Sequence, residues 1–294
     1  MVYFFRIVGR ILGTLRAEYR QLANRYFGHI ERFDGNARDI CRQVVEKLWE
    51  GDFYRTSLGH FDFFWMRDFG TVAESLVRIG HQDKVHHTLR WALRHYRRSG
   101  IVTLCIDKAG NTFNAPDVKS IDALPWLLHS IDVSGYPLNE VEKTFLNRQL
   151  RQYRKIFLDR DSGHVKSMRF AEMRDAVVYD RSAYAVTLVA RLARCAENLG
   201  LDFPFRADRY RHELLNHYWN GHYFNADWNN TSFSAECALF PFFMGIVDDE
   251  VRFEKTIHYI KRHKLDQPYP LKYTDTPNTF HYRFWMTWPF MSNY

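Results

Sequence analysis

Cysteine is scarce in this chain of 294 residues, which contains four. Cys41, Cys105, Cys195 and Cys237 show no paired spacing, and this argues against both a zinc site and a disulfide framework. We therefore expect no metal ion and no cofactor. Unpaired thiols fit a reducing compartment, so the sequence predicts a cytoplasmic protein.

Several short catalytic and nucleotide-binding signatures are also missing. The chain has no GxGxxG, no GxxxxGK(S/T), no HExxH and no GxSxG. These absences argue against dinucleotide-binding, P-loop, zinc-protease and serine-hydrolase chemistry. The histidines, including His86, His87 and His258, are interpreted as surface or interface groups rather than ligands.

No apolar run is long enough to cross a bilayer. The opening MVYFFRIVGRILGTLRAEYR is interrupted by Arg6, Arg10 and Arg16, so it is too short and too charged for a membrane span. An amphipathic first helix, an interfacial anchor and a poor signal peptide all remain open. We favour the helix, within a lead-in over residues 1–35, and we regard peripheral membrane contact as the lesser alternative.

Positive charge is in modest excess, with a formal net charge of +7. Such a charge is compatible with binding to nucleic acid, an anionic glycan or a membrane surface. It bears on what the protein associates with rather than on how it folds. The densest basic run, from Arg90 to Arg98, stands just before Ser99 and Gly100, where cations favour the C-terminus of a helix. We therefore expect no binding to nucleic acid.

Aromatic residues are plentiful, with 24 Phe, 17 Tyr and 8 Trp. This supplies ample area for one large core. Aromatic side chains also stack on the faces of sugar rings, so a carbohydrate cleft is one use for the surplus. Composition alone leaves the aromatic core and the carbohydrate cleft equally open.

Helical periodicity dominates the chain, whereas strict alternation is nearly absent, and the sequence therefore predicts an all-α protein. Gly80, Gly100 and Gly200 each follow a periodic run and are suited to close a helix. A short aromatic hairpin is expected over residues 218–230, with Asn220-Gly221 at its turn. The predicted helices span residues 36–50, 69–80, 83–98, 119–133, 138–158, 175–199, 207–219, 234–246, 249–263 and 281 onward.

The helices pair into hairpins, and no Pro/Ser-rich linker or change in composition divides residues 36–294. We therefore expect one domain over this range. The final segment RFWMTWPFMSNY is aromatic and amphipathic and has no cap after it. We expect the domain to be incomplete at its C-terminus.

The most informative cluster is FYRTSLGHFDFFWMRDFG, residues 53–70, which places Trp65, Arg67 and Asp68 just before a predicted helix. One interpretation is structural, with Asp68 as a cap and Arg67 as its ion-pair partner. The segment also resembles the sugar-binding signature of glucoamylases and related six-hairpin glycosidases. That resemblance implies that Arg67 and Asp68 hold sugar hydroxyls, while Trp65 and Tyr54 line the subsite.

A second loop, FNAPDVKSIDALPWLLHSI over residues 113–131, is similar to an Asp-containing loop of the same family. The resemblance makes Asp122 a substrate-binding residue. The alternative is a first-turn acid favoured by the helix dipole. The family typically has a Trp near position 116, where this chain has Pro116.

A third loop, RFAEMRDAVVYDRSAYAVT from residue 169, resembles the family's loop that carries the general acid. By this resemblance Glu172 is the general acid, and Asp175 is its substitute. Apolar neighbours such as Phe170 would raise the pKa of Glu172, while Arg174 would oppose that shift. The alternative is that both carboxylates are first-turn acids of a helix.

Two further positions complete the candidate site. Glu236 lies near a predicted helix start, where capping is the simpler role, and it is our candidate for a second carboxylate. The family would carry an Arg near Lys272, which is the substrate-binding candidate here. Inverting hydrolysis needs a second carboxylate to activate water, and the family's own base comes from a position beyond Tyr294.

The resemblance thus implies an (α/α)6 toroid of helical hairpins and an inverting, exo-acting glycosidase of α-glucosides or α-glucans. Its partner would be a carbohydrate substrate. Two alternatives remain: a catalytically inactive carbohydrate-binding or scaffold protein on the same toroid, and an invertase-like or trehalase-like hydrolase. Fold alone does not separate them, because function resides in the site.

Overall fold

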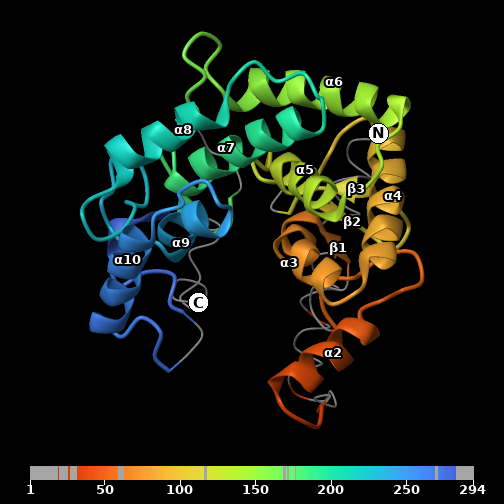
Figure 1. Ribbon diagram of the computed structural model, residues 1–294, viewed down its shortest axis with the longest axis horizontal. Coiled ribbons are helices and arrows are strands. Elements are labelled where there is room, and N and C mark those ends of the chain that lie inside the picture. The colour runs from red at the N-terminus through yellow and green to blue at the C-terminus, as the bar shows by residue number, and fades with distance from the viewer. Residues whose placement is uncertain are drawn as a thin grey trace.

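The computed structural model describes residues 32–58, 63–115, 118–167, 170, 172–175, 177–268 and 271–282, with Tyr19 and Tyr26 as isolated positions. Helices dominate these ranges, which confirms the predicted all-α class (Figure 1). Most of the predicted lead-in over residues 1–35 lies outside the described residues. The same holds for the helix expected from residue 281 onward, except that residues 281–282 form a strand.

Nine α-helices lie within the described ranges: α2 (Ala37–Lys47), α3 (Met66–Arg78), α4 (Gln82–Ser99), α5 (Ala123–Ser134), α6 (Glu140–Phe157), α7 (Ala183–Asn198), α8 (Ala207–Glu213), α9 (Ala235–Phe243) and α10 (Glu250–Arg262). A π-helical turn (Leu214–Tyr218) continues α8, and a 3₁₀ turn spans Pro277–Thr279. The strands are β1 (Phe64–Trp65), β2 (Cys105–Ile106), β3 (Thr112–Phe113), β4 (Val177–Val178) and β5 (His281–Tyr282). They form one antiparallel sheet in the order β1-β2-β3 and a second pair, β4-β5.

The helices from α3 onward form four successive hairpins arranged as an arc. Helices α3, α5, α7 and α9 make its inner row, each packing against the next, and α4, α6, α8 and α10 lie outside them (Figure 1). Short connections make the two helices of a hairpin antiparallel. The N-termini of all inner helices therefore lie on the same face of the arc.

The helix ends follow the chemistry of their sequences. Asn139 caps α6, because its side chain accepts from the backbone N–H of Glu142 while the Glu142 carboxylate accepts from the N–H of Asn139. At the other end of a helix, Gly100 closes α4 with φ of 80°, a left-handed conformation that glycine adopts without strain.

A close approach between α3 and α5 depends on Gly70. A Cβ atom at this position would lie 2.6 Å from the ring of Trp126, a fully buried side chain of α5. The absence of a side chain at Gly70 therefore sets the distance at which the first two inner helices pack.

The predicted helix over residues 175–199 begins eight residues later than expected. Helix α7 starts at Ala183, because the Ser182 hydroxyl caps it by accepting from the N–H of Ala185. Before this cap, Arg181 adopts a positive φ of 54°, and Val177–Val178 pairs as β4 with β5. Long-range strand pairing thus overrides the helical pattern in this segment, and the prediction was wrong there.

The aromatic hairpin predicted over residues 218–230 is confirmed at its turn. Trp219 and Phe224 form an antiparallel bridge, and the N–H of Asn220 donates to the carbonyl of Tyr223. Gly221 has a φ of 100° within this turn. In the part of the chain described, no helix is both long and apolar enough to span a membrane.

Candidate active site

Several carboxylates and one arginine lie close together on the face of the arc where the inner helices begin. Arg67 lies in the first turn of α3, and Asp122 is the N-cap residue of α5. Asp175 lies in the irregular segment before α7, and Glu236 lies in the first turn of α9. The fold thus brings four segments that are far apart in sequence close together in space.

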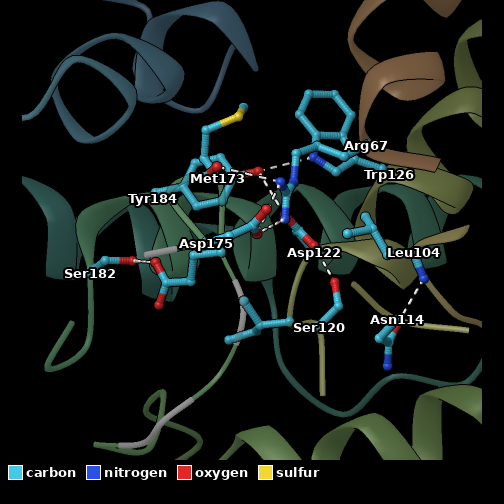
Figure 2. A network of polar contacts seen from close by, with 12 residues as sticks. Arg67, Leu104, Asn114, Ser120, Asp122, Trp126, Met173, Asp175, Ser182 and Tyr184 are labelled. Carbon is cyan, nitrogen blue, oxygen red and sulfur yellow. Dashed lines mark hydrogen bonds and ion pairs between the residues drawn. The ribbon is translucent and has the colours of Figure 1, made fainter. Parts of the chain in front are cut away.

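Arg67 contacts both Asp122 and Asp175 (Figure 2). Its Nε donates to Asp122 Oδ2 at 2.5 Å, and its Nη2 lies 3.4 Å from Asp175 Oδ1. Its Nη1 also donates to the carbonyl of Met173 at 3.4 Å. Burial works against the charged form, but the two carboxylates outweigh it and raise the pKa of Arg67 well above its usual value. The guanidinium is therefore a permanent cation that fixes the segment carrying Asp175.

Asp122 is fully buried and every partner it has is internal. Its Oδ1 accepts from the hydroxyl of Ser120, and its Oδ2 accepts from Tyr184 at 3.2 Å as well as from Arg67. Trp126 in turn donates to the Tyr184 hydroxyl at 3.1 Å. Asp122 occupies the N-cap position of α5 without a side-chain capping bond. Its carboxylate is thus directed at Arg67 rather than at the helix.

Asp175 is the member of the cluster that reaches solvent while remaining ion-paired, with its side chain 30% exposed. Desolvation raises its pKa to about 6, although Arg67 acts in the opposite direction and Asp122 and Asp68 add to the rise. A carboxyl group with such a pKa exchanges protons near neutrality. This combination of access and pKa is what a general acid requires.

Glu172, three residues earlier, has a different environment. It is 4% exposed, and the hydroxyl of Ser182 donates to its Oε2. Desolvation raises its pKa to about 8, against the lowering effect of the Ser182 hydrogen bond. A neutral, enclosed carboxylic acid of this kind is suited to holding the loop against the start of α7. Neither Glu172 nor Asp175 lies in a helix, so the interpretation as first-turn acids was wrong.

Asp68 faces outward beside the buried cluster. Its side chain is exposed, yet desolvation raises its pKa, with Arg67 acting to lower it. Asp68 does not cap α3, whose N-cap residue is Trp65. It remains available to accept hydrogen bonds from a ligand.

Glu236 lies in the first turn of α9 but does not cap it either. Its Oε1 accepts from the Tyr179 hydroxyl at 2.5 Å, and Tyr179 also contacts the Ser234 hydroxyl at 3.1 Å. The residue is 3% exposed. Glu236 is therefore an enclosed carboxylate tied to the segment that follows Asp175.

Three predicted site residues lie at the margin of the cluster or away from it. Trp65 is buried against Leu104 and Cys105, next to β2. The hydroxyl of Tyr54 contacts His81 Nδ1 at 2.6 Å, and His81 lies beyond the far end of α3. The structure therefore directs the polar end of Tyr54 away from Arg67, which corrects its assignment to the subsite. Lys272 is exposed, and its neighbour Tyr273 is electrostatically coupled to Arg67 and Asp175 instead.

Sequence reasoning missed three contributors: Ser120, Tyr184 and Arg174 as a buried cation. Ser120 stands two residues before Asp122, and this spacing was visible in the motif. Tyr184 gave no local signal, because it reaches Asp122 across 62 residues. No group of three or more His, Cys, Asp or Glu side chains suited to a metal ion occurs among the residues that the structure describes.

No protein-family model matches the chain, and no curated protein sequence matches it significantly. Solved structures do resemble it. A glycosidase variant in complex with glucose superposes with a TM-score of 0.56 at 14% identity, covering 78% of this chain and 72% of its own. The wild-type glycosidase gives 0.55 at 15% identity over the same shares of the two chains. The chain has the helical-toroid fold of these glycosidases.

A rhamnosidase from Klebsiella oxytoca with rhamnose bound is also similar in structure. It has a TM-score of 0.51 and 13% identity, and it covers 78% of this chain and 47% of its own. At such identities the likeness describes the path of the backbone alone. The candidate site itself is formed by the side chains of Arg67, Asp68, Asp122 and Asp175.

Proposed function

We propose that this protein is a glycoside hydrolase whose proton donor is Asp175. The observation that carries the proposal is the partly exposed Asp175 carboxyl, held by Arg67 and with its pKa raised to about 6. Hydrolysis of a glycosidic bond begins with protonation of the leaving oxygen, and a carboxylic acid with a raised pKa performs this step. The glycosidase fold of the toroid supports the same reaction class.

The neighbours of Asp175 have distinct roles in this proposal. Asp68, whose side chain is exposed, accepts hydrogen bonds from sugar hydroxyls. Arg67 and Asp122 are positioning residues, because their buried ion pair fixes the segment that carries Asp175. Glu172 donates no proton in this proposal: it is enclosed by Ser182 and 4% exposed, and it anchors the loop.

The proposed substrates are α-glucosides or α-glucans, cleaved from the chain end with inversion. The resemblance of the loops around Asp68 and Asp122 to glucoamylases supports this choice, as does the glucose complex of a structural neighbour. Inversion needs a second carboxylate that activates water. The proposal assigns no residue to that step, because Glu236 is enclosed and bonded to Tyr179.

The test is release of glucose from maltose, maltooligosaccharides, trehalose and sucrose by the wild-type protein and by Asp175→Asn. Release that disappears in the variant, with sugar binding retained, is the expected result. Equal release by both proteins would remove Asp175 from the reaction, and no release from any glycoside would remove the hydrolase proposal.

A carbohydrate-binding protein on the same toroid is the second candidate. The observation that favours it is the burial of Glu172 and Glu236, which leaves neither carboxylate open to a water molecule beside the sugar. Titration calorimetry with glucose and maltose separates the two candidates. Binding without any release of product supports the second candidate.

A further inference from the structure

Three segments of the chain form a cavity of about 350 Å³ that the candidate active site does not use. Residues 178–180 stand before α7, residues 227–230 stand before the neighbouring inner helix α9, and residues 279–281 include the start of β5. None of the four residues that form the candidate active site lines the cavity. Its volume is at the lower end of the range of about 300–1,000 Å³ that small-ligand sites occupy, and it therefore suits a small molecule of one ring.

Hydrogen bonds between the three segments fix the shape of the cavity. The N–H of Asp180 donates to Asp227 Oδ2 at 3.1 Å, and the N–H of Trp228 donates to the carbonyl of Asp180 at 3.0 Å. Asn230 Nδ2 donates to the carbonyl of Thr279 at 3.1 Å. Strands β4 and β5 pair directly beside these contacts. The walls are thus joined to one another without a ligand, so that binding loses little free energy to ordering them.

Asp180 and Asp227 give the cavity an excess of hydrogen-bond acceptors. Asp227 is 7% exposed, and its Oδ1 accepts from the N–H groups of Asn229 and Asn230. Asp180 accepts from the hydroxyl of Ser167 and from Asn229 Nδ2. A carboxylate has about four lone-pair positions. Both carboxylates therefore keep the capacity to accept from a further donor.

Charge argues against an ion in this cavity. Asp180 and Asp227 disfavour an anion, and no Lys or Arg is part of the lining. A metal ion needs several ligands around one point, and the part of the chain that the structure describes contains no group of three or more His, Cys, Asp or Glu side chains suited to one. Desolvation raises the pKa of Asp227, and Asp180 adds to the rise, while backbone N–H groups oppose it. A hydroxyl donor would replace part of the hydration that Asp227 has lost.

Apolar and amide groups complete the lining. Val178 and Phe280 contribute carbon surface, and Asn229 and Asn230 contribute amides. A sugar ring has apolar faces that pack on such surface and hydroxyl groups that both donate and accept. The guanidinium of Arg174 lies 4.8 Å from the ring centre of Phe280, and its positive charge disfavours an organic cation at the same wall. A neutral sugar thus fits the lining better than an ion of either sign.

We propose that this cavity is a second carbohydrate-binding site, which binds one neutral sugar ring through hydroxyl groups that donate to Asp180 and Asp227. The choice of glucose as the sugar rests on the proposed glycosidase function. The preference for a neutral ligand rich in hydroxyl groups rests on the cavity alone.

The experiment measures hydrogen–deuterium exchange by mass spectrometry, because this method locates binding within the chain. Glucose is added to the wild-type protein, and exchange is followed in peptides that contain residues 178–182 and 227–232. We expect glucose at about ten times its Kd to slow exchange there about tenfold, because a ligand that binds the closed state lowers the population of the open state in this proportion.

Two variants test the residues of the cavity. Asp180→Asn keeps the size of the side chain and removes its charge, whereas Val178→Phe fills part of the space and leaves both carboxylates in place. Both variants should lose the slowing by glucose in these peptides. Thermal unfolding of each variant verifies that the fold is intact.

Two further variants are controls that should keep the slowing. Asp107 accepts from the side chain of Asn111 as Asp180 accepts from that of Asn229, but it stands between β2 and β3. Asp107→Asn is therefore the matched control for loss of a carboxylate. Asp68→Asn weakens sugar binding at the candidate active site, and it should leave exchange around the cavity as responsive to glucose as in the wild type.

The outcomes separate this inference from the hydrolase proposal. Exchange that glucose does not slow, or slowing that Asp180→Asn and Val178→Phe both retain, would overturn the inference. Slowing that Asp68→Asn abolishes would assign the effect to the candidate active site and would also overturn it. Sugar seen in the cavity of a glucose-soaked crystal without slowed exchange in solution would be binding at crystal concentration only, with the same consequence. Slowing that depends on Asp180, in a wild-type protein that releases no glucose from any glycoside, would overturn the hydrolase proposal alone.

Discussion

Arg67 Nε lies 2.5 Å from Asp122 Oδ2, and this contact joins helices α3 and α5 across 55 residues of chain. Both side chains are buried, so neither has water to replace its partner. The pair thus serves two ends at once: it fixes the first two inner helices and it presents the remaining guanidinium nitrogens to Asp175.

Removal of Arg67 should destabilise the fold more than the loss of a surface ion pair. Arg67→Met leaves Asp122 buried and without its cationic partner, and we expect a loss of about 3–5 kcal/mol in the free energy of unfolding. Urea unfolding measures it. The double variant Arg67→Met with Asp122→Asn removes both charges and should recover part of the loss; additive losses in the double variant would contradict the coupling.

Asp175→Asn should lower kcat by about 100-fold or more with little change in KM, because general acid catalysis contributes that order of rate. The active form of Asp175 is the protonated one. Since the pKa of Asp175 is raised to about 6, kcat/KM should fall as the pH rises through about 6. A profile that stays flat from pH 5 to pH 8 would count against Asp175 as the acid.

Glu172→Gln is the matched variant at the neighbouring carboxylate, and we expect activity near that of the wild type. The pKa of Glu172 is raised to about 8, so its side chain is neutral at pH 7 and a neutral amide of similar shape replaces it. A loss of turnover as large as that in Asp175→Asn would instead assign the proton donor to Glu172.

The same variant should change how stability depends on pH. The folded pKa of Glu172 is raised above its unfolded value, so the stability it contributes is fully present below about pH 4.5 and is lost as the pH rises through about 8. Thermal unfolding of the wild type should therefore decline between these values more steeply than that of Glu172→Gln. Parallel curves would show that Glu172 is not the buried neutral acid described above.

Asp68→Asn should weaken sugar binding while leaving the fold intact. The side chain is exposed and does not cap α3, so its removal costs little stability, whereas a charged acceptor for sugar hydroxyls is lost. We expect the Kd for glucose to rise about tenfold, the order of one charge-assisted hydrogen bond. Calorimetry measures the Kd, and an unchanged value would exclude Asp68 from the subsite.

Gly70→Ala should be destabilising although alanine favours helices. The new Cβ would lie 2.6 Å from the Trp126 ring, and overpacking of this kind typically costs about 1–3 kcal/mol, more than the roughly 1 kcal/mol gained in helix propensity. Thermal unfolding measures the balance. An increase in Tm would show that α3 and α5 adjust without strain.

Local chemistry made most of the helices predictable. The run ending at Gly100 and the Asn139–Glu142 box contain their own stop and start signals, and the structure uses both. The segment before Ala183 was different, because its conformation depends on strand pairing with His281–Tyr282, about a hundred residues away. No local periodicity encodes such a partner.

The candidate site was predictable as a set of residues but not as an arrangement. The loops that contain Arg67, Asp122 and Asp175 were identified from their resemblance to loops of six-hairpin glycosidases, and the structure brings these three residues together. Which carboxylate reaches solvent depends on side-chain direction in three dimensions. The sequence does not show this direction, so the resemblance favoured Glu172 as the general acid. The burial of Glu172 against Ser182 is visible only in the folded chain.

Because the inner helices all begin on the same face of the arc, the residues of the site come from segments that the ribosome makes at different times. The residues gathered there range from Arg67 to Glu236, and a ribosome adding about 5–20 residues per second needs roughly 10–30 s to make the stretch between them. During that interval Arg67 and Asp122 can already pair, whereas the partners that α9 supplies do not yet exist. The ion pair between Arg67 and Asp122 can therefore form before the fourth hairpin, which supplies Glu236, has been made.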